Sequence, residues 1–244
     1  MNNGIYSSAL GGIMAMRELE ITANNLANID TPGYKVDRCR TTASLNHISR
    51  QEFDKFRNQL KDIRDLLDVK TSYTQGSMRN TDNPLDLAIE GEGFFVVEGE
   101  DGDLYTRSGA FKLDTEGYLI ASDGRRVMGE GGPIQITAGE FVVSSDGEVL
   151  ADGQSVDRLL IVDFKENQDL TKKAGTYFEA PRGRERPAVE YSIVQGALES
   201  SNVNLMKTMI QLIQTQRSFN SYMKMIGTQN DLNSRAVQDL ARIR

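Results

Sequence analysis

The residue types that most often carry catalysis or bind metals are scarce in this chain. Cys39 and His47 are its only cysteine and its only histidine. The sequence therefore predicts no intrachain disulfide, no cysteine-based metal site and little histidine-dependent chemistry, with His47 at the surface. Glycine-containing stretches such as GEGFF and MGEGGPI lack the Lys-Ser/Thr of a phosphate-binding loop, and no G-x-S-x-G elbow occurs. We expect no cofactor and no enzymatic activity.

Two further patterns have both a chemical and a simpler interpretation. Asp-Gly pairs recur between residues 101 and 153, but their spacing fits no calcium-binding loop, and Asp-Gly is a preferred pair for tight hairpin turns. Arg182, Arg184 and Arg186 form a small basic cluster that would suit an anion or an acidic partner, although we favour a solvated loop. A hydrolase of cell-wall polymer would need paired carboxylates in a groove, and no spacing indicates such a pair.

The charge distribution separates the two ends of the chain from its middle. The 244 residues carry a net charge of −7, which argues against a nucleic-acid partner. Residues 1–40 have net charge 0, residues 41–195 have −10 and residues 196–244 have +3. No stretch approaches the roughly 20 apolar residues of a membrane span, and residues 1–16 lack the basic segment of a secretory signal. By these rules alone the protein would be cytoplasmic.

The N-terminal end is predicted to be one helix of about seven turns that starts almost at residue 1. It carries a stripe with the alternating four-three spacing of a heptad pattern. The stripe consists of Ile5, Ala9, Gly12, Met16, Leu19, Ala23 and Leu26. Because several of these residues are small, the stripe lets another helix approach closely, with Gly12 at a tight contact, but it buries little apolar area.

The stretch DTPGYK, residues 30–35, should end this helix in a fixed corner formed by Asp30, Thr31, Pro32, Gly33 and Tyr34. Proline lacks an N–H group, and Pro-Gly suits the central positions of a type II turn. Asp30 is expected to accept hydrogen bonds from the turn. The Tyr34 ring is expected to pack against a neighbouring molecule.

The C-terminal end predicts a longer helix, from about residue 203 to 243, capped by Asn202 or Ser201. Its stripe has the same spacing and consists of Leu205, Met209, Leu212, Gln216, Phe219, Met223, Ile226, Asn230, Asn233, Val237 and Leu240. The matching periods predict that the two end helices pair with each other. The alternative is that each helix covers the middle of the chain.

The middle of the chain has short apolar or alternating runs that are separated by turn residues, which predicts an antiparallel β domain over residues 83–195. Between the first helix and this domain, residues 41–82 form a connector. Apolar residues at three- and four-residue steps predict a helix within it at about 49–69. The expected fold is therefore α+β: a coiled-coil-like inner domain of paired terminal helices (1–40 and 196–244) with a central antiparallel β domain.

Three blocks of the sequence resemble the bacterial flagellar basal-body rod and hook proteins. NNLANIDTPGYK (24–35) is similar to the N-terminal signature of that family. NPLDLAIEGEGFFVV (83–97) with YTRSGAFKLDTEGYL (105–119) resembles the opening of its central domain, and GALESSNVNLMKTMIQLIQTQRSFNSYMKMI (196–226) resembles its C-terminal helix. The blocks occur in the order of the family. One departure is Asn220, where many relatives have an acidic residue after the aromatic at Phe219.

The resemblance implies a structural subunit of the flagellar rod, located in the basal body and spanning the periplasm. In that family the terminal helices pack with neighbours around an export channel, so all stripe residues above become candidate subunit contacts. The implied partners are other rod subunits, copies of this chain and the flagellar export apparatus, with no nucleic acid and no membrane span. Export without a cleaved signal replaces the cytoplasmic prediction.

Within the family, NTDNPLDLAI and GEGGPIQI look more like the proximal-rod subunit than the distal one. The distal-rod subunit is the first alternative. The second is a secreted coiled-coil adaptor with a β head, which would form a finite oligomer where a rod protein forms an open helical array.

Overall fold

The computed structural model describes residues 2–41, 67–100, 102–136, 141–165, 170–173, 175–181 and 183–242. The chain divides into two compact units. The helical unit comprises Met1–Ala27, Asp37–Lys70 and Asn204–Arg244, and the β unit comprises Asn28–Val36 and Thr71–Val203. Residues 28–36, which include the corner stretch, and residues 196–203 therefore belong with the β region, whereas the sequence assigns them to the inner domain.

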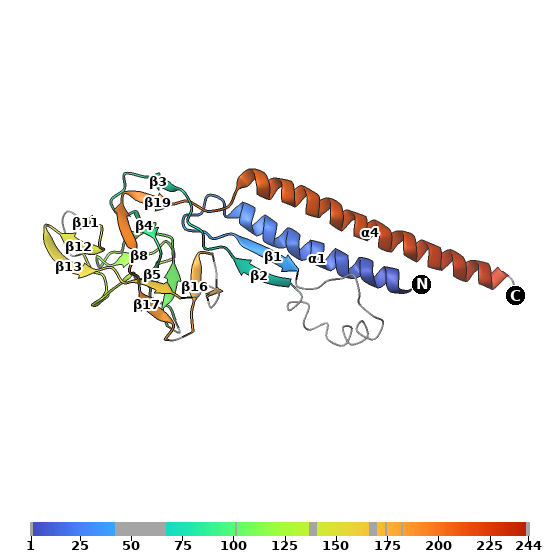
Figure 1. The fold of residues 1–244 in the computed structure, drawn as a ribbon, viewed down its shortest axis with the longest axis horizontal. Coiled ribbons are helices and arrows are strands. Elements are labelled where there is room, and N and C mark those ends of the chain that lie inside the picture. The colour runs from blue at the N-terminus through green and yellow to red at the C-terminus, as the bar shows by residue number, and fades with distance from the viewer. Residues whose placement is uncertain are drawn as a thin grey trace. The chain divides into compact units, whose positions relative to one another are not determined.

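The helical unit contains the two long helices, α1 (Asn2–Ala27) and α4 (Leu205–Arg242), which lie side by side and run in opposite directions (Figure 1). The 26 residues of α1 make just over seven turns, as predicted. The predicted cap of the second helix is wrong. Asn204 caps α4, because its Oδ1 accepts a hydrogen bond from the Lys207 backbone N at 3.0 Å.

The same unit contains a two-stranded sheet of β1 (Asp37–Thr41) and β2 (Leu67–Thr71). Residues 49–66 of the predicted connector helix lie outside the described residues. Residues 67–69 belong to β2, so the prediction is wrong for its last three positions. Leu67 and Val69 alternate with polar residues, which is the two-residue period of a strand. Pairing with β1 stabilises this strand in place of the predicted helix.

The largest sheet of the β unit has six strands, in the order β15-β16-β6-β5-β14-β17. In the same order their bounds are Thr171–Lys172, Tyr177–Glu179, Leu104–Thr106, Phe94–Val97, Ile161–Phe164 and Glu185–Pro187. Every pairing in this sheet is antiparallel, as predicted. The central β5 is buried on both faces: Phe94 and Val96 enter one apolar cluster, Phe95 and Val97 the other.

Smaller antiparallel sheets complete the β unit. One has three strands, β11 (Phe141–Val143), β12 (Glu148–Ala151) and β13 (Gln154–Arg158). The others are pairs: β18 (Tyr191–Gln195) with β4 (Leu87–Gly91), β19 (Ala197–Glu199) with β3 (Met78–Asn80), β7 (Lys112–Leu113) with β8 (Leu119–Ile120), and β9 (Met128–Gly129) with β10 (Gly132–Pro133).

The Asp-Gly pairs form turns, but of more than one kind. Asp152 and Gly153 have φ of 51° and 77°, and they join β12 to β13 as the two central residues of a hairpin turn. In the pairs at 123–124 and 146–147, and also at Gly117 after Glu116, the glycine alone has positive φ, since Asp82 and Asp152 are the two non-glycine residues with positive φ in the described part of the chain. Among the Asp-Gly pairs of which both residues are described, the expected turn with two positive φ values is therefore confirmed at residues 152–153 only, and Asp101 lies outside the described residues.

Candidate functional site

The corner after α1 is held by backbone contacts to the β unit. Tyr34 N donates to Thr31 O at 3.3 Å and Gly33 has φ +69°, as a type II turn requires. Gly33 N also donates to Glu199 O at 2.7 Å. A Cβ at Gly33 would lie 2.3 Å from Ser108 N, so this position excludes a side chain both by conformation and by space.

The side chains of the corner differ from the expectation in two ways. Asp30 is the expected acceptor, but the described side-chain hydrogen bond at the turn is accepted by Asn28. Its Oδ1 accepts from the Thr31 hydroxyl at 3.2 Å. Tyr34 is 1% exposed within its own chain, so its ring is not free for a neighbouring molecule. The Lys172 ammonium lies 3.9 Å from the centroid of this ring, in cation–π geometry.

Three ionised side chains meet next to the corner, all nearly inaccessible to solvent. Glu199 Oε1 accepts from Lys35 Nζ at 2.7 Å and from Gly76 N at 2.8 Å, and Arg107 Nη1 lies 3.5 Å from Glu199 Oε2. Burial is the largest influence on the pKa of Lys35 and of Arg107 and lowers both, while the Glu199 carboxylate opposes it. Arg107 also donates to the carbonyls of Ile89 and Gly91.

Asn202 joins the same network of segments. Its Oδ1 accepts from Val36 N at 2.8 Å, and its Nδ2 donates to Ser72 O at 2.8 Å and to Thr74 O at 2.9 Å. Glu199 and Asn202 therefore tie together three stretches that are distant in sequence: 28–36, 71–77 and 199–203. We call these stretches the connecting segments, because the chain passes from one unit to the other at their ends.

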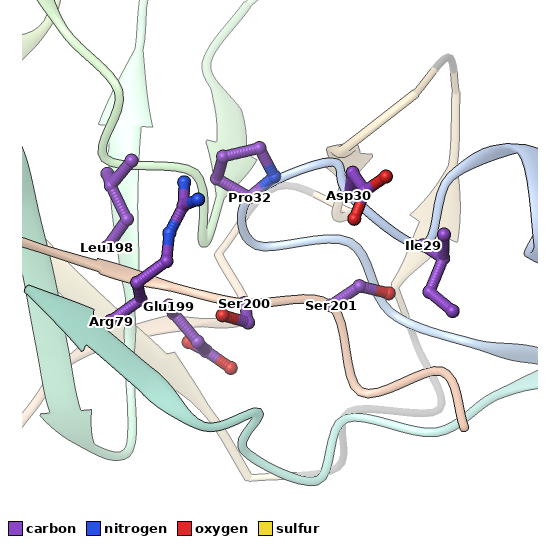
Figure 2. A pocket seen from close by; sticks show the side chains of 8 residues that line it. All are labelled: Ile29, Asp30, Pro32, Arg79, Leu198, Glu199, Ser200 and Ser201. Atoms are coloured by element: carbon purple, nitrogen blue, oxygen red, sulfur yellow. The ribbon is translucent and has the colours of Figure 1, made fainter. Parts of the chain in front are cut away.

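A pocket of about 160 Å³ lies beside the connecting segments (Figure 2). Pro32 and Asp30 come from the corner, while Arg79 comes from β3 and Leu198 from β19. At about 30 Å³ per water the pocket has room for a few waters or one side chain, well below the 300 Å³ or more typical of small-molecule sites. Its size does not favour a cofactor.

Most of the fully buried residues on α1 and α4 are small or polar. Ser8, Gly11, Ala15 and Thr22 are buried on α1, as are Thr208 and Thr215 on α4. A Cβ at Gly11 would lie 2.5 Å from Tyr222 Cε1, and Gln211 Nε2 donates to Glu18 Oε1 at 3.0 Å. The contact face of α1 is therefore shifted by one residue from the predicted stripe.

The expectation that Gly12 forms the tight contact is wrong, because its Cβ would lie 3.7 Å from Tyr222 Cβ, an ordinary contact distance. On α1, Ile5, Ala9, Leu19 and Leu26 are half-buried, and Ala23 and Met16 are exposed. On α4, Leu212, Phe219 and Ile226 are half-buried. Leu205, Met209, Gln216 and Met223 are exposed, and the side chains of Val237 and Leu240 lie outside the described residues. The stripe was selected for apolar character, whereas close helix approach selects small residues.

Large apolar side chains instead cover the outside of the helical unit, each at least 40% exposed. We call this set the outward apolar face: Ile13, Met16, Leu205, Met206, Met209, Ile210, Ile213, Met223, Met225 and Leu232. Isolated exposed apolar residues are ordinary, but a run of this length on neighbouring helices is typical of an interaction surface.

The other candidate features do not assemble into a chemical site. Arg186 lies on β17, where its Nε donates to Asp163 Oδ2 at 3.0 Å across the sheet, so it is not part of a solvated loop. Arg182 lies outside the described residues. Within the described ranges, no three His, Cys, Asp or Glu residues are grouped as a metal site would require, and neither long helix is apolar enough to cross a membrane.

Sequence comparison identifies the class to which these features belong. The chain matches the family models for the flagellar hook protein FlgE/F/G D1 domain at residues 88–151, the flagellar basal body rod FlgEFG protein C-terminal region at 194–239, and the flagella basal body rod protein at 8–35. The matches include the corner, β5 and most of α4.

Full-length relatives give the same result. The chain is 32% identical to the flagellar basal-body rod protein FlgF of Caulobacter vibrioides, with 100% of both chains covered. It is 30% identical to FlgF of Salmonella typhimurium, with 99% of both covered, and 32% identical to FlgG of Agrobacterium fabrum, with 93% and 95% covered. The chain belongs to the flagellar basal-body rod protein family. This is a family of structural proteins of the flagellar basal body, not of enzymes.

Proposed function

We propose that this chain is a structural subunit of the flagellar rod, which assembles with other rod subunits and with copies of itself through the outward apolar face. The observation that carries the proposal is the inverted polarity of the helical unit. Its fully buried residues are mostly small or polar, such as Gly11 and Thr215, while large apolar side chains such as Met206, Ile210 and Ile213 are more than half exposed. A helical hairpin of this kind gains stability when neighbours cover it.

The free energy from burying the outward apolar face is similar in size to the free-energy cost of association. Burying a large apolar side chain stabilises by about 1.5–3 kcal/mol, so covering ten that are already about half-buried contributes on the order of 10 kcal/mol. Association costs about 4–15 kcal/mol. One neighbour that covers part of the face would bind weakly, whereas several neighbours in an open array would cover it fully.

The proposal also covers the packing of the two helices, the place of the chain in the rod and its export. We propose that α1 and α4 form a coiled-coil-like inner domain and that the predicted stripe residues exposed on it, such as Met16, Met209 and Met223, contact neighbours. The FlgF and FlgG relatives named above match over 95% or more of their length, and we propose the proximal rod as the position of this chain. The chain would reach the basal body through the flagellar export apparatus without a cleaved signal.

The test replaces Ile210 and Ile213 together by glutamine in the native strain. Both side chains are more than half exposed, so the fold should survive while rod assembly and motility fail. The matched control is Gln214→Asn, an exposed polar change on the same turn of α4. Wild-type motility in the double variant would contradict the proposed interface. A finite soluble oligomer of the purified chain, with no incorporation into basal bodies, would favour the adaptor.

A further inference from the structure

We infer that Glu199 is a conformational lock that makes the connecting segments one rigid body with the β unit, and that this lock is separable from the stability of the β core. The inference rests on hydrogen bonding and burial within the β unit. Only its motility readout rests on the proposed function.

Glu199 makes hydrogen bonds with both of the other connecting segments. Through its carboxylate Glu199 holds Lys35 of the first connecting segment and Gly76 of the second. Through its carbonyl it holds Gly33, at the turn of the corner. One residue of the third segment therefore carries three of the bonds that close the other two around it. None of the three belongs to a strand ladder, so their loss leaves the six-stranded sheet paired.

Two buried cations share one buried carboxylate, because the side chains of Lys35, Arg107 and Glu199 are 1%, 6% and 1% exposed. Arg107 Nε has no hydrogen-bond partner in the described part of the chain. Removing the carboxylate charge leaves two buried cations without the carboxylate that they share, whereas removing Lys35 leaves Glu199 still paired with Arg107 and Gly76. The lock is therefore asymmetric: Glu199 is essential to it and Lys35 is not.

Asn202 makes hydrogen bonds with the same two connecting segments as Glu199. Asn202, three residues along, bonds Val36, Ser72 and Thr74, and Lys35 Nζ also donates to Thr74 O at 2.9 Å. These bonds fix the same two segments from the other side. When the carboxylate is lost, these bonds must hold the segments alone, and the Gly76 amide loses its acceptor, whereas the Ser72 amide keeps its bond to Val36 O at 2.9 Å.

The experiment measures amide hydrogen exchange by NMR on the full chain carrying Glu199→Gln, which keeps the size of the side chain. We expect exchange at Gly76 to rise at least tenfold, while Ser72, whose amide bonds Val36 O, and the β5 amides that pair with β14 keep their protection. Lys35→Met should raise exchange at Gly76 by no more than about threefold, since the carboxylate keeps two partners. The control is Glu116→Gln, which removes a 66% exposed partner of Arg126.

Several results would overturn the inference. Exchange in Glu199→Gln equal to the Glu116→Gln control would show that the carboxylate locks nothing. Loss of protection in β5 together with Gly76 would show that Glu199 supports the whole β unit and not a local lock. A larger effect of Lys35→Met than of Glu199→Gln would refute the asymmetry. In the native strain, Glu199→Gln should impair motility although the subunit is folded, and normal motility would show that the lock has no role in the rod.

Discussion

The contact between Gly11 and Tyr222 gives the sharpest test of how α1 and α4 pair. A Cβ added at Gly11 would lie 2.5 Å from Tyr222 Cε1 and 2.6 Å from Cζ. Carbon atoms in favourable contact are about 3.5–4.0 Å apart, so the ring would have to move by about 1 Å. At Gly12 the added atom would lie 3.7 Å from Tyr222 Cβ, which requires no movement.

These distances can be converted into stability. Replacing a helical glycine by alanine stabilises the helix by about 1 kcal/mol, and this gain is common to both positions. Overpacking costs about 1–3 kcal/mol and applies to Gly11 only. Gly12→Ala should therefore stabilise the helical unit by about 1 kcal/mol, and Gly11→Ala should leave it unchanged or destabilise it by up to about 2 kcal/mol. The difference between the two variants isolates the contact.

The assay is the helical circular dichroism signal of the full chain during a urea titration, with both substitutions repeated in a Tyr222→Ala background. If the contact exists, removing the ring should bring the two glycine variants to the same stability, with a coupling energy of about 0.5–3 kcal/mol between residues 11 and 222. Equal stabilisation by Gly11→Ala and Gly12→Ala in the wild-type background would refute the helix register described here.

Three shorter predictions test other parts of the molecule. Gly33→Val should destabilise the β unit by at least about 2 kcal/mol, because a β-branched residue is strained at positive φ, whereas Tyr34→Phe should cost no more than about 1.5 kcal/mol; urea melts followed by tyrosine fluorescence compare them. Asn204→Ala should lose about 1 kcal/mol of helix stability and fray the first turn of α4, which amide exchange at Lys207 would detect. Met206→Gln should reduce incorporation into basal bodies without lowering the melting temperature, since this side chain is 70% exposed.

Features set by neighbouring residues could be predicted from the sequence. The end of α1, the turn at Pro32 and Gly33 and the hairpin at Asp152 and Gly153 all follow from local backbone preferences. The run GFFVV forms β5, the most buried strand of the main sheet. The sequence predicts the helix cap two residues too early. Asn202 and Asn204 are equally suited to a cap, but the Asn202 side chain makes hydrogen bonds with the distant backbone of residues 36, 72 and 74.

Features that join distant parts of the chain could not be predicted. Lys35 and Glu199 are separated by 164 residues, and neither has a local reason to be buried. The available signal was a charged residue inside a short apolar strand, Ala197–Glu199, and it does not identify a partner. The apolar pattern on α1 predicts a stripe one residue away from the contact face, because the residues that approach α4 most closely are small or polar and not apolar.

The difference between the predicted stripe and the observed contact face suits helices that bind other subunits. A helix that buries its large apolar residues against its own partner has little left with which to bind another subunit. In this chain Gly11 and Thr215 make the internal contact, and Ile210 and Ile213 stay exposed. We expect the apolar area that α1 and α4 leave exposed to remain available for association. The β unit has the opposite arrangement, with its apolar clusters inside. The same chain therefore combines a unit whose apolar clusters lie inside it with a unit that we expect to be stabilised by its neighbours.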